Sequence, residues 1–173
     1  MLVFLPLIIH AQNLDPRNSN PESLRQAIKM ATTDSAKYST TFKLFIYYQY
    51  DNTDSAFKYI DQCLVIAHKN NYKINEADCL QNIGGELTRL GKYAEAFDSF
   101  QEAFKIAEDP ANENNAFKND NKYSFHQNRL DVLGWSHFNF VSDIFIDSIN
   151  QQMFQYRKIL QLGEEAGDKL LAA

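Results

Sequence analysis

Histidines and cysteines are the residues of this chain best suited to metal or redox chemistry. His126 and His137 lie eleven residues apart. On a helix they would share a side but stand about 16 Å apart, too far for one metal ion. The chain has no G-x-S-x-G and no H-E-x-x-H, and Gly84 and Gly85 fall inside a predicted helix rather than in a phosphate-binding loop. We therefore predict no enzyme, no cofactor and no metal site.

The two cysteines, Cys63 and Cys79, allow one further kind of chemistry. Each stands about seven residues from a predicted turn near 70–73, so two antiparallel helices would place them at similar height. In an exported protein they are candidates for a disulfide. The alternative is two small buried apolar residues, because Cys63 aligns with an alanine in the neighbouring repeat.

The composition favours a folded, mostly helical protein. Apolar residues make up 45% of the chain and aromatic residues 13%, whereas there are only 6 glycines and 4 prolines. The net charge is −5, and no run of five basic residues is present. We therefore expect no nucleic-acid partner, since phosphate binding needs clustered cations.

The first eleven residues are typical of a signal-peptide remnant. An apolar run covers residues 2–9, and Ile9 and Ala11 stand at the −3 and −1 places of a possible signal-peptidase site. No basic residue precedes the run. The run is too short to cross a bilayer, which predicts no membrane insertion of this segment. We expect residues 12–20 to form a linker and the protein to be periplasmic or otherwise extracytoplasmic. An ordinary apolar N-terminus on a cytoplasmic protein is the alternative.

Internal similarity divides most of the chain into three repeats. Residues 80–109 align with residues 44–70 and again with residues 140–165, and the shared apolar positions keep helical spacing. The predicted repeats cover about 35–70, 75–109 and 124–165. The Asn- and Asp-rich stretch 111–122 is interpreted as an exposed loop between repeats, with a linker between two domains as the alternative.

Each repeat is predicted to contain two helices. In the central repeat these are 75–90 and 93–108, joined at Gly91. A capping helix is expected over 21–31, with Asn20 as its N-cap. Residues 167–173 are interpreted as the start of another helix, so we expect a C-terminally truncated part of a longer protein. The predicted repeat domain covers 21–173.

The central repeat resembles the tetratricopeptide repeat (TPR) family. Small residues at Gly84, Ala96 and Ala103 stand where two helices approach closely. Bulky residues fill the family's other places, namely Leu80, Ile83, Leu87, Tyr93 and Phe100. The resemblance implies an all-α helix-turn-helix solenoid of about three repeats. The repeats are also similar to extracytoplasmic TPR regions of bacterial sensor kinases and regulators.

The resemblance implies a concave groove lined by the first helix of each repeat. Its lining would be aromatic at one end and aliphatic at the other, which suits an amphipathic helix or an extended peptide. The alternative is that Phe45, Ile144 and Phe145 pack against a neighbouring repeat or against the polar loop folded over them. The predicted partner-binding residues are Tyr38, Phe45, Tyr48, Gln81, Arg89, His137, Ile144 and Phe145.

The resulting functional prediction is a non-enzymatic module for protein–protein interaction or scaffolding, forming the sensing or assembly region of a longer bacterial protein. A protein or peptide is the expected partner. Two alternatives stay open: a helical protein that binds a small ligand, and a structural array that associates with copies of itself.

Overall fold

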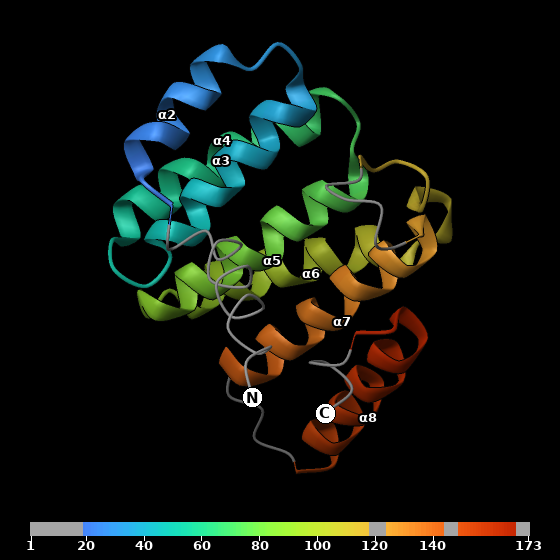
Figure 1. The fold of residues 1–173 in the computed structure, drawn as a ribbon. Coiled ribbons are helices and arrows are strands. Elements are labelled where there is room, and N and C mark those ends of the chain that lie inside the picture. The colour runs from blue at the N-terminus through green and yellow to red at the C-terminus, as the bar shows by residue number, and fades with distance from the viewer. Residues whose placement is uncertain (1–18, 118–123, 144–148, 169–173) are drawn as a thin grey trace, which may run out of the picture. The chain divides into compact units, whose positions relative to one another are not determined.

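A computed structural model describes residues 19–117, 124–143 and 149–168 (Figure 1). All regular elements in these ranges are helical, which confirms the predicted all-α class. The helices are α2 (Pro21–Met30), α3 (Asp34–Tyr48), α4 (Thr53–Lys69), α5 (Lys73–Arg89), α6 (Tyr93–Glu108), the short 3₁₀ helix η2 (Pro110–Asn112), α7 (Phe125–Asp143) and α8 (Ile149–Ala166). The predicted signal remnant, and the linker up to residue 18, lie outside the described residues.

The chain forms two compact units, residues 1–63 and 64–173, whose boundary falls inside α4. The sequence left open a division at the polar stretch 111–122, and the structure does not divide the chain there. The core of the first unit consists mainly of side chains from α3 and α4. Its fully buried members are Tyr38, Leu44, Phe45, Ala56, Ile60 and Cys63.

Helix α2 begins as the sequence predicts. The Asn20 side chain accepts a hydrogen bond from the backbone N–H of Glu22 at 2.9 Å, and Pro21 occupies the first helical position. The helix packs on α3 and ends at Met30, followed by Ala31 in an extended conformation. Arg25 joins it to the next two helices by donating hydrogen bonds to the hydroxyls of Tyr48 and Tyr59.

Helices α5 and α6 form the closely packed pair that the central repeat predicts. A Cβ atom on Gly84 would lie 2.8 Å from the Phe100 ring, so only glycine allows this approach. Ala96 and Ala103 are fully buried beside it. Tyr93 differs from the expectation, because half of its side chain is exposed instead of filling the gap between the helices.

The turn between these helices depends on Gly91. Its φ is +74°, a left-handed conformation that glycine adopts without steric cost. The N–H of Lys92 donates to the carbonyl of Leu87 at 3.0 Å, and the N–H of Gly91 donates to that of Thr88 at 2.9 Å. This pattern is a Schellman-type helix end.

The first part of the polar stretch 111–122 packs against the start of α5, which corrects its interpretation as an exposed loop. The N–H of Ile74 donates to the carbonyl of Asn115 at 3.2 Å, and the buried Asn75 side chain accepts from the N–H of Phe117 at 3.1 Å. Tyr72 and Phe117 pack with ring centroids 5.3 Å apart. The contact with Asn115 satisfies the Ile74 amide group, which lies at the start of α5 and has no partner within the helix.

Helices α7 and α8 form the third pair, within the predicted third repeat. Phe140 on α7 contacts the rings of Phe97, Phe100 and Phe104 on α6. The indole N–H of Trp135 donates to Asp168 at 3.1 Å. Helix α8 ends at Ala166, and Gly167 follows with a φ of +73°. The helix predicted over 167–173 lies mostly outside the described residues.

Candidate functional site

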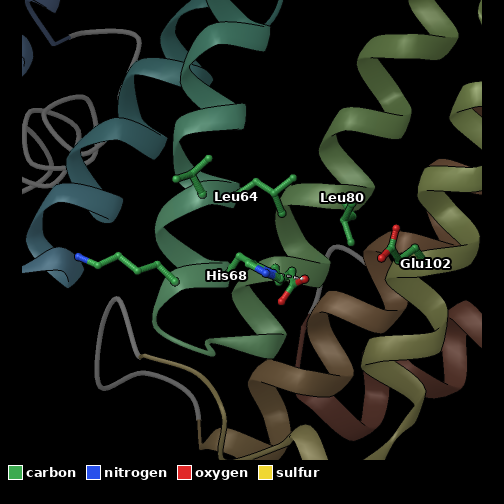
Figure 2. A pocket seen from close by; sticks show the side chains of 7 residues that line it. Leu64, His68, Leu80 and Glu102 are labelled. Atoms are coloured by element: carbon green, nitrogen blue, oxygen red, sulfur yellow. Dashed lines mark hydrogen bonds and ion pairs between the residues drawn. The ribbon is translucent and has the colours of Figure 1, made fainter.

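An open groove of about 460 Å³ lies within the second unit, over the last turns of α4 and the adjoining faces of α5 and α6 (Figure 2). Helix α4 supplies four side chains on one side of the helix, because Leu64 and Val65 lie one turn before His68 and Lys69. Helix α5 contributes two residues and α6 one. The lining consists of Leu64, Val65, His68, Lys69, Glu76, Leu80 and Glu102.

Apolar side chains form the centre of the groove. Leu64 is partly buried, and Leu80 is buried at its base. Val65 is 61% exposed, which makes it the most accessible apolar side chain of the lining. The exposure of Val65 could have been predicted from the sequence. The buried face of α4 includes Cys63 and Ala67, and Val65 is an apolar residue that lies off that face.

Charged side chains surround the apolar centre. Nδ1 of His68 lies 3.2 Å from Oε1 of Glu76, and the Lys73 ammonium group donates to Oε2 of the same carboxylate at 2.8 Å. Burial raises the pKa of Glu76, but the hydrogen bonds from Lys73 and His68 outweigh it and leave that pKa below its usual value. Glu76 is therefore ionised at neutral pH, and the Lys73 ammonium group balances its charge.

Glu102 stands on the α6 side of the groove. Its side chain is exposed, and it makes no hydrogen bond or ion pair with other residues in the part of the chain that the structure describes. Figure 2 shows Leu80 between His68 and Glu102. The groove therefore has an apolar centre, a basic side on α4 and an acidic side on α6.

The predicted concave-groove residues of the first repeat lie mostly in the core. Tyr38 and Phe45 are fully buried, and each packs on the ring of Phe42. Tyr48 is partly exposed, but its hydroxyl accepts a hydrogen bond from Arg25 at 2.6 Å. Accessibility was expected for Tyr38 and Phe45, whereas both side chains are buried in the core of the first unit.

The predicted residues of the other two repeats also make intramolecular contacts. Gln81 is buried and accepts a hydrogen bond from the Asn139 side chain. Arg89 is exposed and pairs with the buried Glu86. His137 is buried against Phe104. None of the six predicted residues that the structure describes lines the groove over α4, α5 and α6. Ile144 and Phe145 lie outside the described residues.

The two cysteines are buried free thiols, so the disulfide considered from the sequence is not formed in this structure. The Cys63 thiol instead donates a weak hydrogen bond to the carbonyl of Tyr38, with Sγ and O 3.8 Å apart. Both side chains occupy the small apolar positions that the alternative interpretation assigned to them.

Within residues 19–117, 124–143 and 149–168, no three His, Cys, Asp or Glu side chains are grouped so that they could hold a metal ion. No helix in the same ranges is long and apolar enough to cross a membrane.

Consecutive helix pairs, with small residues where the helices approach and a Schellman turn between them, define a TPR protein, a class of protein-interaction modules. A family described as the SusR N-terminal TPR domain matches residues 12–127, and the chain belongs to this family. No curated protein and no solved structure matches the chain.

Proposed function

We propose that this chain is a non-catalytic module that binds a segment of another protein in the groove over α4, α5 and α6. The observation that carries the proposal is the exposed apolar centre of this groove, above all Val65. Placing one large apolar side chain of a partner there would contribute about 1.5–3 kcal/mol. The surrounding charges would then orient the partner rather than supply most of the affinity.

We further propose that the module works outside the cytoplasm, as the sensing or assembly region of a longer protein. The support is the signal-like N-terminal segment together with the resemblance to extracytoplasmic TPR regions. Protease treatment of intact spheroplasts should degrade the module while a cytoplasmic marker survives. Protection of the module until the membrane is lysed would contradict this location.

The groove is tested by a photo-crosslinking amino acid at position 65 in the full-length protein in cells. We expect a specific adduct with a partner, and we expect Val65→Asp in a purified pull-down to reduce recovery of that partner at least tenfold, because a carboxylate would be buried in an apolar contact. Val65 is exposed, so the variant should keep the thermal unfolding midpoint of the parent protein.

Met30→Asp is the matched control, because Met30 is an even more exposed apolar residue, 79% accessible, on α2. The control variant should recover the partner normally. Equal recovery with Val65→Asp and Met30→Asp would show that the groove is not the binding site.

A further inference from the structure

The cations on the α4 and α5 side of the groove already have partners within the chain. Nδ1 of His68 lies 3.2 Å from Oε1 of Glu76, and Lys73 donates to the other oxygen of that carboxylate at 2.8 Å. Lys69 is not without a partner either. This side of the groove therefore offers a bound segment little unbalanced positive charge.

The α6 side of the groove carries carboxylates that are still available. Glu102 lines the groove, and Asp98 lies four residues before it, on the same side of α6. Both side chains are exposed, and neither makes a hydrogen bond or ion pair with another residue in the described ranges. Lys105, one turn beyond Glu102, is likewise not paired with it there. Two negative charges therefore stand beside the apolar centre (Figure 2).

Helix α6 gains nothing from the charges of this pair. Glu95 stands in the first turn, where the helix dipole favours a negative charge, and it pairs with Lys92 at 3.4 Å. Asp98 and Glu102 lie beyond that turn, where the dipole effect has faded. Like charges four residues apart destabilise a helix. A cation bound beside both carboxylates would remove this repulsion.

We propose that the groove selects a basic apolar segment of its partner protein, in which one large apolar side chain covers Val65 and Leu80 while a neighbouring Lys or Arg pairs with Glu102. Asp98 attracts the same cation. This inference rests on the proposed function of the groove as a protein-binding site, and it adds the chemistry of the partner, with Glu102 as the specificity-determining residue.

The side chains of lysine and arginine suit this groove in two ways. Their long apolar stems can cover apolar lining while the charged head reaches a carboxylate at the rim. An acidic segment, by contrast, would be repelled at Glu102, and it would have to compete with Glu76 for His68 and Lys73. The groove therefore discriminates between segments that have the same apolar anchor but opposite charges.

Two labelled amphipathic peptides test this discrimination. They have the same length and the same apolar face of leucines, and their polar positions are all lysine in one and all glutamate in the other. Fluorescence anisotropy with the purified whole chain should show about tenfold tighter binding of the Leu–Lys peptide. Added salt should weaken this binding, because the carboxylates are exposed to solvent.

Charge reversal locates the selectivity. Glu102→Lys should weaken binding of the Leu–Lys peptide about fivefold, because it replaces an attraction by a repulsion. The double variant Asp98→Lys, Glu102→Lys should prefer the Leu–Glu peptide. Glu164→Lys is the matched control, since it changes the net charge of the chain equally at an exposed position on α8, and it should leave the preference for the Leu–Lys peptide in place.

Thermal unfolding separates lost recognition from a damaged fold. Glu102→Gln removes the repulsion with Asp98, so the free protein should unfold at a slightly higher temperature while its affinity for the Leu–Lys peptide falls. A lower unfolding temperature together with weaker binding would mean that Glu102 has a structural role, and it would count against the proposed selection.

A photo-crosslinking amino acid at position 65 shows whether the peptide occupies the groove. It should label the Leu–Lys peptide, and mass spectrometry of the adduct formed in cells should find Lys or Arg beside the crosslinked apolar residue of the natural partner. Equal affinity for the two peptides, or an equal loss with Glu102→Lys and Glu164→Lys, overturns the charge selection.

The adducts separate this inference from the function on which it rests. If a partner forms adducts at position 65 through an acidic or uncharged segment, the groove remains a binding site and only the charge selection fails. If neither a peptide nor a cellular protein forms adducts there, both proposals fail.

Discussion

His137 is a buried histidine that is neutral in the folded protein. Its Nδ1 lies 2.7 Å from Oε1 of Gln155, which can only accept, so Nδ1 carries the proton. Its Nε2 is buried and has no hydrogen-bond partner within the described ranges. The ring packs on Phe104 with centroids 4.5 Å apart. Protonation of Nε2 would place a charge in this apolar contact.

Burial lowers the pKa of His137 below its ordinary value, and the nearby charge of Lys158 lowers it further. The hydrogen bond with Gln155 and the charge of Glu108 act in the opposite direction but do not outweigh burial. The His137 imidazole therefore takes up a proton near pH 6.5 in the unfolded chain but stays neutral in the folded chain. As a result, the free energy of unfolding falls as the pH drops through that value. Urea unfolding between pH 7.5 and 5 should show this loss, and His137→Gln should reduce it. His126→Gln, at an exposed position, should leave it in place.

Asp78 has the opposite dependence on pH. Burial raises its pKa to about 6, against hydrogen bonds from Gln81 and Asn82 that favour the charged form. The ionised carboxylate therefore destabilises the folded state. The free energy of unfolding falls as the pH rises from about 4 to 6. Asp78→Asn should stabilise the protein at pH 7 by roughly 1–3 kcal/mol.

The same Asp78→Asn comparison contains its own control. Near pH 4 the aspartate is mostly neutral in the folded protein, so the two proteins should unfold at nearly the same urea concentration. A stability difference that is equal at pH 4 and pH 7 would mean that the substitution acts through shape or hydrogen bonding, and not through the charge.

At the scale of the element, the α5–α6 pair depends on the contact between Gly84 and Phe100. Gly84→Ala would improve helix propensity by about 1 kcal/mol, but its Cβ would collide with a fully buried ring. We expect a net loss of about 1–3 kcal/mol in unfolding free energy, because overpacking outweighs propensity. Thermal or urea unfolding measures it.

Two variants show whether the ring causes that loss. Gly85→Ala makes the same backbone change at a partly exposed position and should be neutral or stabilising. Phe100→Leu creates space opposite Gly84, so the double variant should lose less than the sum of the single variants. Full additivity would argue against the predicted collision.

At the scale of the whole molecule, a substitution in one compact unit should destabilise that unit more than the other. Repeat arrays gain stability within repeats and from their nearest neighbours. Phe100→Ala removes a buried ring from the second unit and should cost about 3–5 kcal/mol there. Hydrogen exchange should show a larger loss of protection in α5, α6 and α7 than in α3. An equal loss in all four helices would indicate one cooperative unit.

The sequence predicts the helices and their ends because the signals are local. Asn20 caps α2 through an amide two residues away, and Gly91 ends α5 through its own backbone conformation. The small residues of the central repeat likewise predict close packing, which the Gly84 contact confirms. These features depend on residue type at fixed spacing, so the chain alone shows them.

Only the tertiary structure decides which side chains remain accessible. Tyr38 and Phe45 occupy predicted groove positions but lie in the core, whereas Val65, Leu80 and Glu102 meet at a groove that periodicity does not predict. The polar segment after η2 likewise packs on α5 through amides about forty residues distant in sequence. Burial depends on residues far apart in the chain, so a helical pattern predicts which face is apolar but not what covers it.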